Sequence, residues 1–541
     1  MDSGGYFVTT IKRGWTVAKN NHMKIVTSDQ MRDLDRRAGE LGLSGDILMA
    51  NAGLAVAQEV SKWLGGVNDC RIIILVGPGN NGGDGLVVAR HLHDWGARVH
   101  LQIPKTRAES DPNYRLVQQR NITVLSADQD RELEALLLSM DVVIDSFFGT
   151  GKARPLDGIY KHILDKIQVV KQSNPRLKCI ALDIPSGLDP DTGSVDSSCF
   201  SADFTVTLAN PKKGLFSFPG AAKVGELIVA DIGIPPTLSD NIPLEMLTSK
   251  SVKAMLGKRP LDANKGTFGK VLVVAGSINY VGAAYLACTA AIRVGAGLVT
   301  LATPCSIHRI LASKLAEVTY IPLPECDGVI DLKAVQIIQE RLPDYDVLLL
   351  GCGLGQSEVT QKFVRKTLFS LPPDTPLVVD ADGLNSISGD AHWWKRLPPK
   401  TVFTPHPGEM ARLADVSTEE IQSARLVMAQ EKAISWQKTV VLKGAHTIIA
   451  APDGNTKISG VANPGLASAG TGDILSGAIA GLMAQGLTPC DAAACGVYLH
   501  GMAGEIVRRR IGDMGMVASD LLPVLPLAIK EVKEGIYVTS N

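Results

Sequence analysis

The sequence predicts an α/β protein of two domains, each built on a mostly parallel sheet. The chain has 541 residues, which is more than one hydrophobic core usually serves. Short apolar runs such as Arg71–Val76 alternate with helical patterns. Glycine is abundant at 53 residues and often clusters directly after these runs. Strands that alternate with crossover helices form parallel sheets, with their loops free to face ligands.

Composition narrows the class of protein. Hydrophobic residues make up 45%, charged residues 20%, and the formal net charge is -1, whereas a nucleic-acid binder is usually basic. The nine cysteines form no CxxC pair, as expected of a reduced, cytoplasmic chain without a zinc site. No apolar run is long enough to span a membrane. Residues 1–22 lack an apolar signal core, and we interpret them as an extension before a second possible start at Met23.

The first half opens with a helical region and then a βαβ unit. Residues 27–64 are predicted as helix, capped by Thr27 or Ser28, with one apolar stripe early and a second over 48–60. The strand Arg71–Val76 runs into a glycine-rich loop, Gly77–Gly85. A helix over 86–95 and a strand over 98–103 complete the unit. Such a loop occupies the usual ligand position of a parallel sheet.

The glycine-rich loop matches a dinucleotide fingerprint only in form. Gly77, Gly79 and Gly82 fit GxGxxG, but the fingerprint also needs an acidic residue at the end of the next strand. That strand ends in Ile103-Pro104-Lys105, so a dehydrogenase is disfavoured. Asn80, Asn81 and Asp84 are polar groups that a simple turn does not need. A plain turn rich in Asn and Gly remains the alternative.

Two further strand ends carry polar side chains. Asp145 lies near the end of the predicted strand over 141–146. Asp183 lies near the end of the predicted strand over 179–184, and Ser186 follows that strand. The carboxyl ends of parallel strands share one edge with the glycine-rich loop. Oxygen ligands from Asn81, Asp145 and Ser186 suit a hard cation. The alternative for Asp183 is a loop-capping role before Pro185.

Three motifs together resemble the NAD(P)H-hydrate epimerase (YjeF N-terminal) domain. They are NNGGDG over 80–85, DSFFGTGKARP over 145–155 and LDIPSG over 182–187. The resemblance covers residues 23–248 and implies a Rossmann-like three-layer domain that interconverts the R and S forms of NADH and NADPH hydrates. It implies acid–base catalysis by Asp183 and potassium binding by Asn81, Asp145 and Ser186. The residues it implies for hydrate binding are Asn80, Asn81, Gly82, Gly83, Asp84, Gly149, Thr150, Gly151, Lys152, Ala153, Arg154, Pro155 and Asp183.

A proline-rich linker over 234–243 leads into a second α/β pattern. The glycine-rich stretch Lys265–Gly269 precedes a strand over 270–275, and a small-residue helix is predicted over 282–294. Further strands are predicted at 298–302, 347–350, 377–379, 401–404 and 440–442. A mostly parallel sheet with crossover helices is the simplest arrangement of these elements.

The stretch Asn463–Gly477, reading NPGLASAGTGDILSG, is the strongest single signal. Three glycines precede Asp473, and an apolar helical run follows over 474–482. Glycines let backbone approach a ligand, and a helix N-terminus binds anions. A carboxylate at that site acts as a base on a substrate hydroxyl. The alternative is that Asp473 only caps the helix.

Four more polar loops follow strands of this half: 351–355, 380–385, 405–409 and 443–447. With the Gly465 loop they are predicted to form one convergent rim. No GxxxxGK[ST] motif occurs, so a P-loop fold is disfavoured.

These loops resemble the ADP-dependent NAD(P)H-hydrate dehydratases of the ribokinase-like superfamily. The motifs are NKGTFGKVLVVAGS, GCGLG, DADGLN, TPHPGEM, VLKGAHT and NPGLASAGTGDILSG, within a predicted domain of residues 249–541. Cys352 stands where proline is expected, and Ala462 where glycine often precedes NPG. The resemblance implies Asp473 as catalytic base. It implies hydrate binding by Ala283, Gly353, His406 and Asp473, and nucleotide binding by Lys443, Gly444, Ala445, His446, Thr447 and Gly472.

The two resemblances together imply a bifunctional repair enzyme. It would epimerise the hydrates and dehydrate the S form to NAD(P)H at the expense of ADP, giving AMP and phosphate. Potassium, magnesium and ADP are the implied cofactors and co-substrate. Partners would be small molecules, without nucleic acid or membrane, in a cytoplasmic homo-oligomer.

Two other functions stay open at this point. A kinase for a small alcohol or vitamin would use the same loop and Asp473, because fold does not fix substrate. The attached epimerase-like half argues against it. A non-catalytic scaffold is the other alternative, against which Asp145, Asp183 and Ser186 argue.

Overall fold

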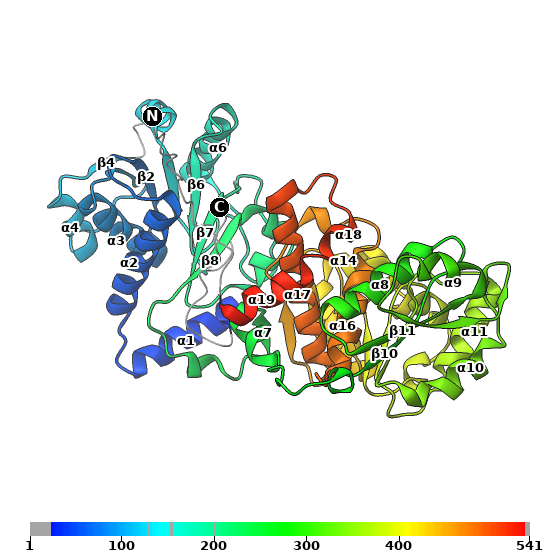
Figure 1. The fold of residues 1–541 in the computed structure, drawn as a ribbon. Helices are drawn as coiled ribbons and strands as arrows, with labels where there is room; N and C mark the ends of the chain where they lie inside the picture. The colour runs from blue at the N-terminus through cyan, green and yellow to red at the C-terminus, as the bar shows by residue number, and fades with distance from the viewer. Residues whose placement is uncertain (1–22, 127–129, 152–154, 200, 536–541) are drawn as a thin grey trace, which may run out of the picture. The chain divides into compact units, whose positions relative to one another are not determined.

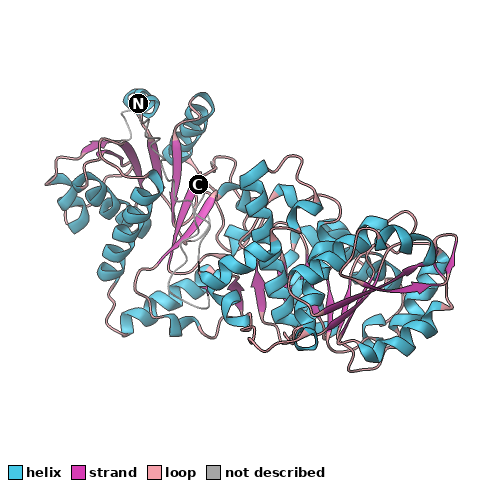
Figure 2. Cartoon of the chain, viewed as in Figure 1, coloured by secondary structure: helices cyan, strands magenta, loops and turns pink. Residues whose placement is uncertain are grey.

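The computed structural model describes residues 23–126, 130–151, 155–199 and 201–535. The chain divides between Ile242 and Pro243 into two compact units. Both contain sheets flanked by helices (Figure 1, Figure 2). The predicted extension, residues 1–22, and the predicted hydrate contacts Lys152, Ala153 and Arg154 lie outside the described residues.

The N-terminal unit is built on a seven-stranded sheet in the order β4-β3-β2-β5-β6-β7-β8. Every neighbouring pair in it is parallel. A two-residue strand, β1 (Met23–Lys24), precedes these strands in the chain. The sheet strands are β2 (Arg71–Val76), β3 (Arg98–Gln102), β4 (Thr123–Leu125), β5 (Val142–Ser146), β6 (Lys178–Leu182), β7 (Phe204–Leu208) and β8 (Glu226–Ala230).

Helices cover both faces of this sheet. Side chains of α2 and α3, such as Val60 and Leu86, pack with Ile72 and Ile74 of β2. Side chains of α5 and α6 pack against the opposite face, on Ile73 and its neighbours. The Rossmann-like three-layer prediction is therefore confirmed. The helices are α1 (Ser28–Glu40), α2 (Gly45–Leu64), α3 (Asn80–Asp94), α4 (Pro112–Gln118), α5 (Asp130–Ser139) and α6 (Gly158–Ser173), with 3-10 turns η1 (Lys213–Phe216), η2 (Gly220–Lys223) and η3 (Pro236–Ser239).

The region predicted as helix over 27–64 is two helices. Thr27 caps α1: its Oγ1 accepts a hydrogen bond from the Gln30 amide at 3.2 Å, and the Gln30 side chain accepts one from the Thr27 amide. A turn at Gly42, with φ +93°, then breaks the helix. Ser44 caps α2. The two apolar stripes of the sequence belong to these separate helices.

The predicted loop Gly77–Gly85 is mostly helix. α3 begins at Asn80 rather than at Leu86, so Asn80–Gly85 form its first turns and only 77–79 form a turn. The glycines serve packing: a Cβ on Gly82 would lie 2.0 Å from the Gly77 carbonyl oxygen, and one on Gly85 2.1 Å from Ser146 Oγ. Composition alone indicated a loop, but close approach to β2 and β5 requires glycine inside this helix.

The segment predicted as a linker, residues 234–243, packs against the N-terminal unit. It contains η3, and Ile234, Leu238 and Ile242 pack with Val26 and the apolar stripe of α1. Arg37 Nη1 also donates to the Leu238 carbonyl at 2.9 Å. This segment therefore completes the N-terminal unit before the chain enters the second one.

The C-terminal unit contains a sheet in which the strands of this unit run in the order β9-β20-β19-β18-β17-β16-β15-β10-β11-β12. In this order, every neighbouring pair between β18 and β12 is parallel. The pairs β18-β19 and β19-β20 are antiparallel. The strands are β9 (Leu244–Met246), β10 (Lys270–Val274), β11 (Leu298–Pro304), β12 (Thr319–Leu323), β15 (Val347–Leu350), β16 (Leu377–Val379), β17 (Thr401–Phe403), β18 (Thr439–Leu442), β19 (Ile448–Ala450) and β20 (Thr456–Ile458), with a separate hairpin of β13 (Glu325–Cys326) and β14 (Val329–Ile330).

Three helices form the main core against one face of this sheet. α8, α16 and α17 pack together and bury the side chains that β10, β11 and β15 present on this face of the sheet. The helices of the unit are α7 (Ser249–Met255), α8 (Val281–Arg293), α9 (Cys305–Ala312), α10 (Ala334–Arg341), α11 (Glu358–Leu368), α12 (Asp382–Ile387), α13 (Pro407–Ala414), α14 (Thr418–Ser423), α15 (Arg425–Trp436), α16 (Thr471–Ala484), α17 (Pro489–Ile511), α18 (Ala518–Leu521) and α19 (Leu525–Glu534), with 3-10 turns η4 (Lys265–Phe268), η5 (Leu342–Asp344), η6 (Trp393–Arg396) and η7 (Pro464–Leu466).

The strands named in the sequence analysis of this half are confirmed to within a few residues, whereas β9, β12, β19 and β20 were not anticipated. Several of these are only three residues long, too short for a hydrophobic pattern to define. The helix predicted from Ile474 begins earlier, at Thr471.

We predict that a fragment beginning at Pro243 is more stable than one beginning at Ser249, the predicted start of the second domain. The longer fragment keeps β9, which pairs with Thr456–Ile458, and Thr248, whose Oγ1 caps α7 by accepting from the Ser251 amide at 3.1 Å. Losing one cap alone costs about 1 kcal/mol. Urea unfolding of both fragments measures the difference, and equal midpoints would contradict this account.

Candidate functional sites

The N-terminal unit contains a cavity of about 1360 Å³ at the carboxyl ends of its strands. Its lining includes most described residues of the predicted hydrate-binding set, namely Asn80, Asn81, Asp84, Gly149, Thr150, Gly151, Pro155 and Asp183. Gly82 and Gly83 do not line it. They are buried in the first turn of α3, where a Cβ on Gly83 would meet the Met49 side chain at 2.7 Å.

Two of the three predicted cation ligands, Asn81 and Ser186, line this cavity, and the third, Asp145, is hydrogen-bonded to Ser186. Asp145 is fully buried, and Ser186 donates to it twice, from its amide and from its Oγ, each at 2.7 Å. Asn81 is held by its Nδ2, which donates to the Leu182 carbonyl at 3.4 Å. Burial raises the pKa of Asp145 to about 6. Among the described residues no ion pair balances Asp145, and its oxygens accept hydrogen bonds from the Ser186 amide and hydroxyl and from the Phe147 amide.

Asp183 follows β6 directly, as predicted, and has a left-handed φ of +68°. Its Oδ1 accepts from Thr207 Oγ1 and from the Leu208 amide, each at 3.1 Å, and forms an ion pair with Lys212. Lys212 is 1% exposed, and its Nζ also donates to Thr207 Oγ1 and to the Leu208 carbonyl. A buried ammonium requires such pairing. The loop-capping alternative for Asp183 does not account for a buried lysine partner.

Asp84, on α3, is a second buried carboxyl of the same cavity. It is 7% exposed. Burial raises its pKa well above the usual value, and the charges of Asp183 and Asp35 add to the effect, while Lys212 opposes it. Asp84 and Asp183 thus face one space in different electrostatic environments.

In the C-terminal unit the glycine-rich stretch forms a turn into α16. Gly470, with φ +88°, is the N-cap residue of α16, and no side chain caps this end. Asp473 lies in the first turn of the helix, so the alternative that it serves as the N-cap is wrong. The Thr471 amide donates to the Ser468 carbonyl at 3.4 Å, and no hydrogen bond from the Gly472 or Asp473 amide is found among the described residues, so these two can bind an anion.

Polar groups from three strand ends meet beside α16. Asp380, after β16, is 1% exposed and accepts from Lys443 Nζ at 2.8 Å on Oδ1 and from Ser476 Oγ on Oδ2. Lys443 Nζ also lies 3.7 Å from Glu409 Oε2. His406 caps α13, and its Nε2 lies 3.5 Å from Glu409 Oε1. The loops that carry Asp380, Glu409 and Lys443 therefore converge, as predicted.

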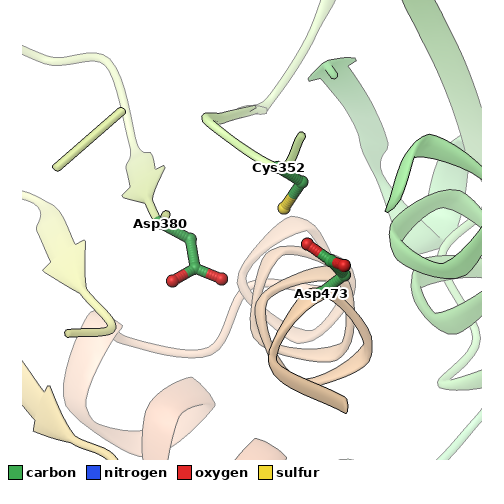
Figure 3. Close-up of side chains that lie close together, drawn as sticks. All are labelled: Cys352, Asp380 and Asp473. Carbon is green, nitrogen blue, oxygen red and sulfur yellow. The ribbon is translucent and has the colours of Figure 1, made fainter. Parts of the chain in front are cut away.

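Cys352, Asp380 and Asp473 approach one another closely. One ligand atom of each lies within 4.8 Å of the others, and Figure 3 shows the Cys352 sulfur between the two carboxylates. Burial raises the pKa of Asp473 to about 7, with a contribution from the Asp380 charge that a hydrogen bond from Cys352 opposes. A carboxyl with this pKa can exchange a proton near neutral pH.

The other predicted contacts of this unit are placed as follows. Ala283 and Gly353 adjoin, because a Cβ on Gly353 would lie 2.6 Å from Ala283 Cβ. Gly472 faces the ion pair, since its Cβ would lie 3.3 Å from Lys443 Nζ. Residues 443–447 connect β18 to β19, and Arg425 holds this turn by donating to the Ala445 carbonyl at 2.7 Å. The His446 ring turns inward to the Ser459 carbonyl at 3.1 Å.

Several residues of these sites were not assigned from the sequence. Lys212 lies in the stretch NPKKG after β7, a strand that was not anticipated. Asp380 and Glu409 stand in motifs that the sequence analysis quoted, and their position directly after strands was the available signal. Cys352 was noticed only as a departure from an expected proline, and its position against Asp473 depends on tertiary structure.

Comparison with protein families gives two matches. Residues 271–527 match the model described as NAD(P)H-hydrate dehydratase. Residues 45–214 match the model described as YjeF-related protein N-terminus. Among the described residues, no helix is long and apolar enough to cross a membrane.

Relatives match along nearly the whole chain. A protein of Moorella thermoacetica named bifunctional NAD(P)H-hydrate repair enzyme is 40% identical over 524 residues, covering 95% of this chain and 98% of the relative. One of Thermofilum pendens with the same name is 38% identical over 520 residues, covering 95% and 97%. A solved ADP/ATP-dependent NAD(P)H-hydrate dehydratase from Bacillus subtilis, crystallised with ATP and Mg²⁺, is 33% identical, covers 53% of this chain and 98% of its own, and has a TM-score of 0.46.

We predict that Asp473→Asn stabilises the protein at neutral and alkaline pH. The pKa of Asp473 is about 7 in the fold and 3.8 in its reference state, so the folded state binds the proton more tightly and loses stability as pH rises between these values. Asn carries no such cost. The thermal midpoint of the variant should exceed that of the wild type at about pH 8, and the gap should shrink towards about pH 5. The exposed Asp262→Asn variant controls for loss of one charge, and a pH-independent gap would contradict the prediction.

Proposed function

Because the chain belongs to the family of bifunctional NAD(P)H-hydrate repair enzymes, we propose that it restores NADH and NADPH from their hydrates. Hydration of the reduced nicotinamide places a hydroxyl on the ring carbon next to the ring nitrogen. The N-terminal unit epimerises the R and S hydrates, and the C-terminal unit dehydrates the S form with ADP. The observation that carries the proposal is the position of Asp473, with its raised pKa, at the uncapped amino end of α16.

The C-terminal chemistry follows from these groups. Asp473 takes the proton of the ring hydroxyl, whose oxygen then attacks the terminal phosphorus of ADP while the bond to AMP breaks. The amides that begin α16 stabilise the charge on the transferred phosphoryl group. Phosphate then leaves from the ring carbon as the neighbouring carbon loses a proton, which restores the double bond. Ala283, Gly353 and His406 are the proposed contacts of the hydrate.

Nucleotide binding is assigned to the turn between β18 and β19. The proposed contacts are Lys443, Gly444, Ala445, His446, Thr447 and Gly472. Arg425 orders the backbone of this turn by bonding its carbonyls, which supports a main-chain contribution to nucleotide binding. The inward-turned His446 ring favours a role through its backbone.

Magnesium would accompany the nucleotide. The cluster of Cys352, Asp380 and Asp473 suits Mg²⁺ poorly, because a thiol is a soft ligand and both Asp380 oxygens already accept hydrogen bonds. We therefore assign Mg²⁺ to the phosphates of ADP, where it neutralises charge during phosphoryl transfer.

Potassium is proposed for the N-terminal unit. Asn81, Asp145 and Ser186 supply oxygen atoms, and Asp145 is a fully buried carboxyl with no cationic partner among the described residues. These residues fit a bound alkali cation, which would supply positive charge beside the cavity. Because the pKa of Asp145 is about 6, cation binding should weaken as pH falls below that value.

We also propose a reducing compartment, the cytoplasm, for this protein, since all nine cysteines are free thiols. Assembly into a homo-oligomer remains a proposal, which light scattering of the purified chain tests.

Asp473→Asn should abolish most dehydration. Asparagine keeps the size of the side chain but cannot accept the hydroxyl proton, so the rate on S hydrate with saturating ADP should fall by roughly 10²–10⁴-fold. Formation of reduced nicotinamide, followed by absorbance, measures it. Epimerisation should persist, because its carboxyls lie in the other unit.

Two results would count against this assignment. A near-normal dehydration rate in the variant would remove Asp473 from the mechanism and direct attention to His406. A wild-type chain that uses ADP or ATP to form a stable phosphorylated alcohol, with no reduced nicotinamide, would favour the kinase alternative.

Potassium should activate epimerisation, and Asp145→Asn should remove that activation. The amide keeps the shape of the side chain but loses the charge that balances a cation. The rate of R-to-S conversion is compared in potassium and in tetramethylammonium salts. Asp165→Asn, at an exposed position on α6 that does not line the cavity, serves as the control for loss of one charge. Equal losses of epimerisation and dehydration in Asp145→Asn would indicate misfolding instead.

A further inference from the structure

The N-terminal cavity presents two buried carboxyls that differ in their partners. Asp183 follows β6, and Asp84 stands in the first turns of α3. Both line the cavity together with Lys212. An epimerase needs one group that gives a proton and one that takes it, and pairs of groups in contrasting environments supply these roles.

Asp183 carries the negative charge of this pair. All of its hydrogen bonds among the described residues fall on Oδ1, from Lys212, Thr207 and Leu208. Lys212 is fixed in turn, since Nζ donates to Thr207 Oγ1 at 3.2 Å and to the Leu208 carbonyl at 3.0 Å. Oδ2 of Asp183 is therefore left for a ligand in the cavity.

Asp84 has the opposite environment. It is 7% exposed, and no hydrogen bond or ion pair to its carboxyl is found within the described part of the chain. An ionised carboxylate in such a place is disfavoured because it has left water without gaining a partner, so the neutral, protonated form is favoured. Lys212 donates no hydrogen bond to Asp84, because its donors are directed to Asp183, Thr207 and Leu208, and its charge offsets the effect of burial only in part.

We propose that Asp84 is the proton donor of the N-terminal site, and that Lys212 is a positioning residue which orients Asp183 as the matching proton acceptor. This inference rests on the proposed epimerase function. It extends that function by dividing acid and base between two named carboxyls.

The reaction balances with water alone. Asp84 gives its proton to the ring hydroxyl as the carbon–oxygen bond breaks, and the lone pair of the ring nitrogen forms a carbon–nitrogen double bond. Water adds to the opposite face of that carbon, and its proton passes to Oδ2 of Asp183. A water in the cavity returns the proton from Asp183 to Asp84. The reverse epimerisation runs through the same steps backwards.

Other charged groups face this space. Arg32, Asp35 and Arg36 line it from α1, and Lys105 lines it from the segment after β3. Asp157 lines it from the segment after β5, and Asp189 and Asp196 line it from the segment after β6. Arg32 is already paired with Asp29 on its own helix. Asp35 provides a test of the proposal, because its charge raises the pKa of Asp84. Asp35 is exposed and takes no part in the proposed reaction.

The first test is Asp84→Asn in the full chain. Conversion of pure R hydrate is followed by chromatography without ADP, so that dehydration does not contribute. The rate should fall by roughly 10²–10⁴-fold, the usual effect of losing a positioned acid. Lys212→Met should also lower the rate, and Lys212→Arg should restore part of it by keeping the cation. Dehydration of S hydrate by the same preparations reports whether the C-terminal unit is folded, and the thermal unfolding of each variant reports whether the N-terminal unit is folded.

The second test separates an acid from a merely structural Asp84. Because the protonated form is required, epimerisation should decline as pH rises through the pKa of Asp84. Asp35→Asn removes a charge that raises this pKa, so the decline should move to lower pH. Asp33→Asn, an exposed carboxylate on the same helix that does not line the cavity, should leave the profile in place.

The outcomes are distinct. If the wild type dehydrates S hydrate but does not epimerise, the proposed epimerase function fails. If the wild type epimerises and Asp84→Asn matches it, or if Asp35→Asn leaves the alkaline limb unmoved, the assignment of Asp84 as proton donor is overturned while the proposed function stands.

Discussion

The close packing of α16 against its neighbours determines where Asp473, the proposed catalytic base, lies. A Cβ on Gly477 would lie 2.1 Å from the Ala287 carbonyl oxygen of α8, and one on Gly481 would lie 2.7 Å from that of Ala291. Only glycine permits this approach, because backbone cannot yield to a side chain. The helix is thereby held in one position, and Asp473 and the uncapped amides of its first turn are held with it.

Both units bury charge at the carboxyl edge of a parallel sheet, and both limit its cost by pairing. Asp380 is balanced by Lys443 in one unit, and Asp183 by Lys212 in the other. The remaining carboxyls, Asp473 and Asp84, lack a direct cationic partner among the described residues, and their pKa values rise. Each unit thus contains one carboxylate fixed by a lysine and another poised to exchange a proton.

Much of this arrangement could be predicted from the sequence, for physical reasons. Branched apolar runs define β2 and β15 to the residue, and polar residues after such strands must gather at one edge. What escaped prediction depends on tertiary contacts. The glycines of Asn80–Gly85 resemble a loop until β2 and β5 are placed against them. Lys212 is distant in sequence from Asp183, and only the pairing of β6 with β7 brings them together.

The turn of residues 443–447 differs from the other loops of its site because it joins two strands that pair directly with each other. Its two ends belong to adjacent antiparallel strands, with Leu442 opposite Ile448, and Arg425 fastens its carbonyls from α15. A crossover loop can lengthen without disturbing its sheet, but a change of length here alters the connection between two directly paired strands, and a one-residue slip of β19 would reverse which of its side chains face the core. The crossover loops can therefore vary in length independently of the sheet, while the length of this turn is tied to the pairing of β18 with β19.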